Sequence, residues 1–261
     1  MKRGVVVSWI IFFAGFVYFF VPLLATLLFS FRARPELAAY ANVLNDPSFS
    51  ASLAYSATVG IVTIVVSILL IMPTAYWVRL RLPRLRPVVE FVTLLPFVIP
   101  PVILVFGLIR TYSGAPFSLT DSDTGSNTLL VAAYVILSFP YMYRAVDTGL
   151  AAIDIRTLTE AAQSMGAGWA RILWRIIFPN VRAALLSGAF LTLAIVMGEY
   201  TIATFLVRPA FGPYLSLLGQ DKPYEPAAAS LISFGITWAA MGMIALLGRG
   251  VGGRIQMTGA R

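Results

Sequence analysis

Long apolar segments separated by short polar ones dominate this chain. Segments without charged residues recur at 4–31, 47–78, 91–109, 124–143, 183–198 and 226–248. A helix needs about 20 apolar residues to cross roughly 30 Å of hydrocarbon. The segment at 183–198 reaches this length only if it continues past Glu199 to Val207. We therefore expect six membrane-spanning helices, at about 8–30, 54–78, 89–110, 128–147, 184–206 and 227–247.

The composition agrees with a chain that lies mostly in a membrane. Of its 261 residues, 59% are hydrophobic, and the mean hydropathy is +0.86. Both values lie far above those of soluble globular domains. In lipid, only helices and closed barrels satisfy their backbone hydrogen bonds, and continuous apolar runs disfavour the alternating pattern of a barrel. The sequence therefore predicts an all-α polytopic membrane protein with six transmembrane helices.

We expect a single transmembrane domain over residues 1–261. Residues 1–52 hold the first helix and an outer loop, residues 53–248 form the core, and residues 249–261 form a tail. The first apolar run is too long for the core of a signal peptide, and no small-x-small cleavage site follows it. The first helix is therefore expected to remain as a membrane anchor.

Lysine and arginine residues indicate which side of the membrane each loop occupies. With the N-terminus in the cytoplasm, 14 of the 19 basic residues lie inside, at Arg144 and in segments 1–7, 79–88, 148–183 and 248–261. The positive-inside rule therefore predicts that both termini are cytoplasmic. The formal charge of +8 follows mostly from this topology and requires no nucleic acid. Six of the 11 acidic residues fall in outer loops: Glu36, Asp46, Asp121, Asp123, Asp221 and Glu225.

The residue types exclude several kinds of chemistry. The chain has no cysteine, and therefore no disulfide, thiolate metal site or cysteine nucleophile. It has no histidine, which excludes histidine-based triads and the usual zinc sites. Its two lysines, Lys2 and Lys222, do not fit a phosphate-binding P-loop. We therefore expect no catalytic residues, metal or cofactor bound by this chain, and if the protein uses ATP with magnesium, another polypeptide must bind them.

Residues 148–183 form the longest predicted cytoplasmic loop, which contains the segment EAAQSMGAGWARILWRIIFP at 160–179. Thr159 is placed to cap a helix that starts at Glu160, and Gly166 with Gly168 allows a turn after it. An amphipathic stretch follows, whose apolar side carries Trp169, Ile172, Leu173, Ile176 and Ile177. Two interpretations are open: a helix that lies on the inner leaflet, or a short rigid helix that docks into a groove of another protein.

The spacing of this segment carries a family resemblance. Glu160-Ala161-Ala162 is followed after three residues by Gly166 and after nine more by Ile176-Ile177-Phe178-Pro179. This pattern resembles the signature loop in the permease subunits of bacterial ATP-binding-cassette (ABC) importers, with Phe178 in place of the usual leucine. The resemblance implies a permease subunit of a type I importer, whose loop between the fourth and fifth spans is a coupling helix seated in a nucleotide-binding subunit.

The same resemblance implies partners, a location and residue roles. The partners are two ATP-binding subunits, a second, homologous permease subunit and a periplasmic solute-binding protein, assembled in the bacterial inner membrane. Small side chains in the loop allow close packing, Glu160 caps or pairs at the docking surface, and Pro179 keeps the coupling helix from running straight into the fifth span. The implied docking residues are Glu160, Ala161, Ala162, Gly166, Ile176 and Pro179.

Prolines interrupt the third predicted span. The segment LLPFVIPPVILVFG contains Pro96, Pro100 and Pro101. Each proline removes a backbone donor and bends a helix, so that neighbouring helices must satisfy the freed carbonyl. These residues are interpreted either as a static packing kink or as a gating hinge.

Glu199 is an ionisable residue within the fifth predicted span. At 1.5 Å per residue, it lies about 24 Å along a helix that starts at Ala183, in the outer third of the core. A charge at this depth is costly unless it faces water or a partner. Flanked by Gly198 and Tyr200, Glu199 is interpreted either as part of a pathway for a cationic solute or as a structural carboxylate bonded to a neighbouring helix.

The region around Glu199, together with the proline-rich span, resembles the second-permease branch that serves spermidine and putrescine. That branch is not sharply separated from permeases for ferric ion, thiamine and aminophosphonates. Acidic outer loops favour a cationic or amine-bearing solute over an anion such as sulfate. A secondary transporter is a less favoured alternative because the prolines of one half have no counterpart in the other. A membrane-embedded enzyme would need a convergent polar cluster, which the sequence lacks.

Overall fold

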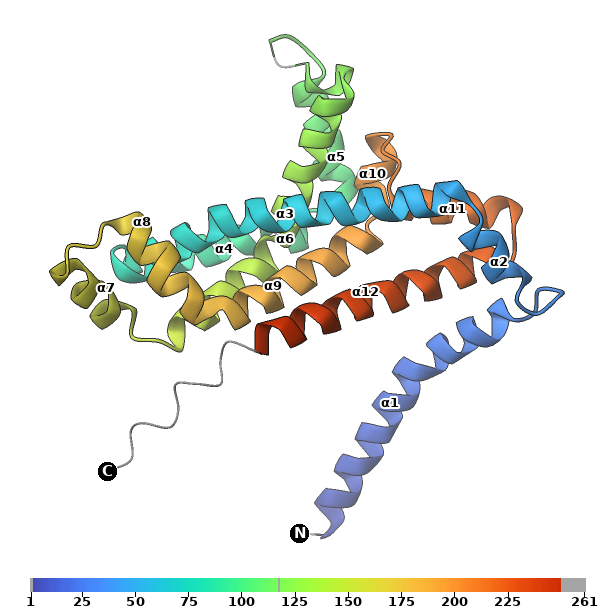
Figure 1. Cartoon of the computed structure of the whole chain (residues 1–261), viewed down its shortest axis with the longest axis horizontal. Helices are drawn as coiled ribbons and strands as arrows, with labels where there is room; N and C mark the ends of the chain where they lie inside the picture. The colour runs from blue at the N-terminus through green and yellow to red at the C-terminus, as the bar shows by residue number, and fades with distance from the viewer. Residues whose placement is uncertain (1, 117, 250–261) are drawn as a thin grey trace. The chain divides into compact units, whose positions relative to one another are not determined.

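The computed structural model describes residues 2–116 and 118–249, which fold into helices joined by turns (Figure 1). No strand occurs in these residues, so the all-α prediction is confirmed. The longer helices are α1 (Lys2–Ser30), α3 (Pro47–Leu80), α6 (Asp123–Ala151), α9 (Phe178–Gly198) and α12 (Glu225–Arg249). The shorter ones are α2 (Ala38–Leu44), η1 (Pro83–Leu85), α4 (Arg86–Val98), α5 (Pro101–Tyr112), η2 (Leu119–Asp121), α7 (Ile155–Ser164), α8 (Trp169–Arg171), the π-helical η3 (Ile172–Ile177), α10 (Thr201–Phe205) and α11 (Phe211–Asp221).

Membrane-spanning helices are readily found among the described residues. Four are long and apolar enough to cross a membrane: Val5–Ser30, Pro47–Leu80, Asp123–Ala151 and Trp169–Gly198. The bent pair Pro83–Val98 and Pro101–Tyr112 adds a fifth if it forms one span. The sixth predicted span, 227–247, lies within α12, which is not among the four. Residues 250–261 of the predicted tail lie outside the described residues.

The described chain divides into two compact units. The smaller unit comprises residues 2–51 and 214–238, and the larger comprises residues 52–213 and 239–249. In the smaller unit, the Tyr214 hydroxyl donates to Asp46 at 2.9 Å and the Asn42 amide donates to Glu225 at 3.0 Å. Most side chains of α1 are exposed and apolar, as expected of a helix that lipid or another membrane helix surrounds.

The larger unit is built on α3, α6 and α9, and α6 packs along α9 (Figure 1). Glycine lets the backbones of α6 and α9 come close, since a Cβ atom at Gly149 would lie 2.6 Å from the Cβ of Ala184. A buried cluster joins α3, α6 and the segment from α7 to α9, and it includes Tyr76, Met142 and Ile172. This cluster fixes the predicted cytoplasmic loop to the ends of two long helices.

The third predicted span is not one continuous helix. α4 ends at Val98, Ile99 and Pro100 are extended, and α5 begins at Pro101 at an angle of 99° to the helical segment before the break. A residue that precedes proline is disfavoured in the helical region, and here both Ile99 and Pro100 precede one. Pro96, whose predecessor is helical, stays inside α4. The prediction of one helix over 89–110 is therefore wrong.

The fifth predicted span also ends early. α9 stops at Gly198, Glu199 is extended with φ −77° and ψ 130°, and the short α10 begins at Thr201. The prediction of a continuous helix over 184–206 is therefore wrong at its outer end. Gly212 packs against the break, because an added Cβ would lie 2.3 Å from the carbonyl oxygen of Glu199. Glu199 thus lies between the end of α9 and the start of α10, so its side chain can reach the free N–H donors of the first turn of α10.

Candidate functional site

The segment between α6 and α9 begins with α7, which is capped by Asp154. The Asp154 carboxylate accepts the backbone N–H of Thr157 at 3.1 Å and its hydroxyl at 2.7 Å. These bonds, the backbone one first, hold the pKa of Asp154 below its ordinary value. Because α7 starts at Ile155, the prediction that Thr159 caps a helix beginning at Glu160 is wrong. Thr159 is instead buried in the helix, and its hydroxyl lies 2.8 Å from that of Tyr76.

The two faces of α7 differ sharply. Ile155, Thr159 and Ala162 are buried against the larger unit. Glu160 and Ala161 are exposed, and the Glu160 carboxylate accepts from Arg156 one turn earlier at 2.9 Å. α7 therefore keeps a small alanine toward the core and presents a charged, polar surface outward.

Gly166 ends α7 in a left-handed turn. Its φ is +78°, which glycine adopts without a steric penalty. The Gly166 N–H donates to Gln163 at 2.9 Å and the Ala167 N–H donates to Ala162 at 2.9 Å. This is the Schellman arrangement, which satisfies the last carbonyls of a helix. Met165, beside the turn, is 79% exposed.

The amphipathic stretch after Gly168 leads directly into the membrane. Ile172 and Ile177 are buried, Ile176 is half-buried, and Arg175 is exposed. The prediction that Pro179 separates this stretch from the fifth span is wrong, because helix Trp169–Gly198 is continuous. The π-helical turn η3 precedes the proline and offers a physical reason, since a wider turn relieves the clash of a proline ring with the preceding carbonyls.

The inner face of this segment is bound to the end of α3. Besides the Tyr76–Thr159 bond, the rings of Trp77 and Trp169 lie 4.8 Å apart, and the Arg81 guanidinium lies 5.5 Å from the Trp169 ring. Hydropathy alone does not indicate these contacts, because the two partners are separated by a whole pair of spans. The sequence offers two local signals for these contacts: the arginine-rich end of the second span and the aromatic side chain of Trp169.

Glu199 lies in a buried network of its own. Only 8% of the residue is exposed. One carboxylate oxygen accepts the N–H of Ile202 at 2.7 Å, and the other accepts the Tyr134 hydroxyl at 2.9 Å and the N–H of Ala203 at 3.1 Å. Both oxygens therefore have partners within the chain, which favours the structural interpretation of this residue. Neighbouring Gly198 ends α9, and Tyr200 is about half exposed.

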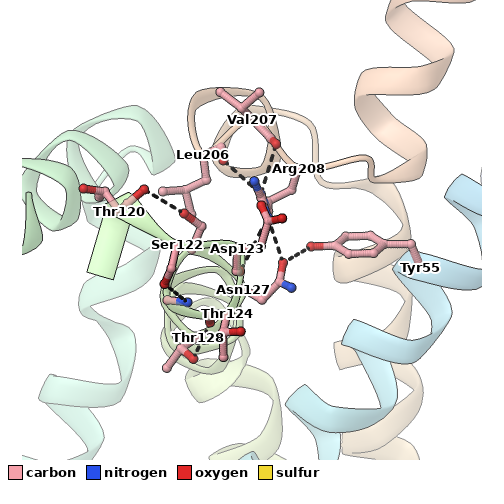
Figure 2. A network of polar contacts seen from close by, with 12 residues as sticks. Tyr55, Thr120, Ser122, Asp123, Thr124, Asn127, Thr128, Leu206, Val207 and Arg208 are labelled. Carbon is pink, nitrogen blue, oxygen red and sulfur yellow. Dashed lines mark hydrogen bonds and ion pairs between the residues drawn. The ribbon is translucent and has the colours of Figure 1, made fainter. Parts of the chain in front are cut away.

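A second polar network holds the turn between α10 and α11 (Figure 2). The Arg208 guanidinium pairs with Asp123 at 2.9 Å and donates to the carbonyls of Leu206 and Val207 at 3.1 and 3.0 Å. Nearby, the Tyr55 hydroxyl donates to Asn127 at 2.6 Å. Val207 adopts φ +54°, which is a rare conformation for a β-branched residue. The two networks together fix the chain on both sides of α10.

The proline-rich break exposes apolar side chains. Pro100 and Pro101 form the junction of α4 and α5, and Val98 beside them is 78% exposed. After the bend, α5 packs on α6 and α10, with Val105 fully buried. Among the described residues, no group of three histidine, cysteine, aspartate or glutamate residues could hold a metal ion.

Comparison with known proteins identifies the family to which this chain belongs. The profile described as "Binding-protein-dependent transport system inner membrane component" matches residues 67–252. The chain belongs to this family. Its relatives are ABC transporter permeases. By its description, the family is an inner membrane component of binding-protein-dependent transport systems.

Curated relatives serve different solutes. The probable sulfate transport permease cysT of Chlorokybus atmophyticus is 33% identical over 129 residues, covering 47% of this chain and 44% of the relative. The spermidine/putrescine permease PotB of Haemophilus influenzae is 23% identical over 228 residues, covering 78% and 76%. The molybdenum permease ModB of Escherichia coli K12 is 29% identical over 177 residues, covering 62% and 75%. The match thus spans less than half of the first relative.

Two solved structures share the fold. One is a bacterial ABC transporter involved in import of the acidic polysaccharide alginate, with a TM-score of 0.65 and 19% identity, covering 94% of this chain and 96% of that one. The other is an amino acid ABC transporter, with a TM-score of 0.57 and 17% identity, covering 81% and 97%. At these identities the likeness extends to the fold and not to the solute.

Proposed function

We propose that this chain is a permease subunit of an ATP-driven importer that takes up a small solute from a binding protein. The observation that carries the proposal is the segment from α7 to η3. It lies between two membrane helices, its inner face is anchored to α3, and its outer face exposes Glu160 and Met165. Membership of the binding-protein-dependent family supports this assignment.

The proposed topology has six spans and cytoplasmic termini. The bent pair α4–α5 is the third span, helix Trp169–Gly198 is the fifth, and α12 is the sixth. In this proposed topology α7 lies in the cytoplasm and serves as the coupling helix, and the distribution of basic residues supports this orientation. We assign the inner bacterial membrane as the location.

In the proposed assembly, the exposed face of α7 docks into a nucleotide-binding subunit. Glu160 and Ala161 lie on that face, Ala162 packs α7 against the core, and Gly166 fixes its exit. Ile176 and Pro179 lie where the segment enters the membrane. ATP and magnesium bind to two copies of the partner ATPase, and a second, homologous permease completes the pathway.

Reconstitution tests this proposal. The chain, its permease partner, the ATPase subunits and the binding protein are placed in liposomes with ATP inside or outside. We expect uptake only with ATP on the cytoplasmic side and with every component present. As a check on partners, affinity capture of the tagged chain should recover an ATPase subunit. Solute uptake by the chain alone, without ATPase subunits, would contradict the proposal.

For the solute, we propose first an amine-bearing cation such as a polyamine. The relative PotB matches over 78% of this chain, and acidic side chains are frequent in the predicted outer loops. In this version, the pathway includes Glu199, Tyr200 and Gly198, and the junction at Pro96, Pro100 and Pro101 acts as a gating hinge.

A second candidate solute is an oxyanion such as sulfate or molybdate. Two observations favour it. Relatives for sulfate and molybdenum are 33% and 29% identical to this chain over the matched segments. The Glu199 carboxylate already accepts three hydrogen bonds within the chain, so it does not need a cationic solute as a partner.

A further inference from the structure

We propose that Arg79, Arg86 and Asp147 are positioning residues that transmit movement of the coupling segment to the proline-broken helix pair α4–α5. This inference rests on the proposed function, because it concerns how docking of the ATPase alters the membrane helices. None of the three residues belongs to the docking face, and none is indicated by the family's loop pattern.

The junction is centred on the Asp147 carboxylate, near the end of α6. One oxygen accepts from Arg79, at the end of α3, at 2.6 Å. The other accepts from Arg86, the first residue of α4, at 2.9 Å. Arg79 also donates to the backbone carbonyl of Asp147 at 2.9 Å. Each oxygen of one carboxylate therefore holds a different helix.

The charges of the junction are matched. Arg86 also pairs with Glu90 at 3.0 Å, so two guanidinium groups face two carboxylates. The Asp147 side chain is only 11% exposed, whereas that of Arg86 is 44% exposed. Replacing Asp147 would remove the counterion that Arg79 and Arg86 share, whereas replacing one arginine would leave the carboxylate paired with the other. In the proposed route, these paired charges act as a unit.

The same end of α3 is held by the coupling segment. Tyr76 contacts Thr159 of α7 through a buried hydroxyl pair, and Trp77 lies against Trp169 of α8. Tyr76 and Arg79 are one helical turn apart, so α3 connects the coupling segment directly to Asp147. A displacement of α7 and α8 therefore reaches the junction through a helix that is bonded at both points.

From the junction, α4 carries the displacement to the break. Arg86 begins this helix of 13 residues, and Ile99 follows its last residue. The Ile99 N–H donates back into α4, to Leu95 at 3.0 Å, and the Pro100 carbonyl accepts from Leu104 of α5 at 3.2 Å. Pro100 and Pro101 have no N–H, so neither can donate a hydrogen bond across the break that would resist a change in angle between α4 and α5. We infer a route from α7 and α8 through α3 and Asp147 to α4 and the break.

The absence of cysteine in the chain allows a direct test with introduced spin labels. Labels at the exposed positions Ala170 and Thr128 report movement of the coupling segment relative to α6. Labels at Val98 and Thr128 report movement of the break. In the complete importer, we expect ATP to change both distances in the wild type. In Asp147→Asn, we expect only the Ala170–Thr128 distance to change.

Uptake per ATP hydrolysed gives the second readout. We expect Asp147→Asn and Arg86→Gln each to lower this ratio by about fivefold or more, the lower range of coupling between distant sites. The double variant should be no worse than the more severe single variant, since the residues act as one unit. Arg86→Lys should retain part of the ratio, and Arg84→Gln, on the exposed turn η1, should match the wild type.

The outcomes separate this inference from the proposed function. If the wild-type importer shows no ATP-driven uptake, the proposed function fails. If the wild type works and both single variants keep its ratio and its Val98–Thr128 change, the inference is wrong. It is also wrong if ATP hydrolysis and uptake fall in parallel with a lower melting temperature, since that identifies a purely structural junction. Arg86→Gln, at the more exposed position, decides the matter if Asp147→Asn does not assemble.

Discussion

At the scale of single residues, Glu199 shows what hydropathy can and cannot predict. Its charge within an apolar run predicts a residue with a partner or a function. The identity of that partner depends on the end of α9 at Gly198, which frees the N–H groups of Ile202 and Ala203 for the carboxylate. The residues of the ionic junction were also missed, because Asp147 lies 68 and 61 positions from Arg79 and Arg86. No local pattern links residues so far apart.

We expect Glu199→Gln to destabilise the protein. The carboxylate now accepts hydrogen bonds from three donors. In either orientation of the new amide, its NH₂ group would face at least one of these donors and could not accept its hydrogen bond. The cost should be about 1–3 kcal/mol, as for an unsatisfied buried polar group. Tyr134→Phe removes one of the same bonds without changing charge and should act in the same direction. Thermal unfolding of the purified complex measures both effects.

A role of Glu199 in the solute pathway predicts a different pattern. Glu199→Gln would then keep the wild-type melting temperature and lose uptake of an amine cation, while Tyr134→Phe would keep both. Basal ATP hydrolysis should survive in either case, because neither residue contacts the coupling segment. That result would contradict the structural interpretation drawn from the three hydrogen bonds.

At the scale of elements, apolar runs predict where helices lie but not where they break. The break in the third span follows from two consecutive prolines, each of which restricts the residue before it. Pro179 has the opposite outcome, since the π-helical turn η3 lets the helix continue through it. The turn at Gly166 was predictable from the residue type alone, whereas the start of α7 at Ile155, capped by Asp154, required knowledge of the backbone.

Two variants of the coupling segment test its role. Gly166→Val forces a β-branched residue to φ +78°, at a cost of about 1–2 kcal/mol. Glu160→Lys replaces the ion pair with Arg156 by two like charges one turn apart. We expect both variants to insert in the membrane and to lose uptake while ATP hydrolysis continues. Uptake and hydrolysis are measured in the same liposomes.

Gly166→Asn is the matched control for the turn, because asparagine tolerates the left-handed conformation better than valine. It should retain most of the uptake. Wild-type uptake by both Gly166→Val and Glu160→Lys would remove the assignment of α7 as the docking element.

At the scale of the whole molecule, charge and hydropathy predict the class of protein more firmly than its solute. The basic residues concentrate on one predicted side, and the apolar runs agree with a polytopic membrane component. The family match confirms this class. Relatives of similar sequence carry the names of spermidine/putrescine, sulfate and molybdenum permeases, so membership of the family does not predict the solute.

The last prediction concerns the solute and uses the cognate solute-binding protein. We expect it to bind an amine-bearing cation when it is titrated with polyamines, aminophosphonates, thiamine, ferric ion, sulfate and molybdate in calorimetry. The physical basis is the acidic character of the predicted outer loops, which would attract a cation released toward the membrane. Tight binding of sulfate or molybdate, with no amine bound, would remove this argument. The full hydrogen bonding of Glu199 would then account for that residue without any solute, and the importer assignment would stand, because it rests on the coupling segment and the family match.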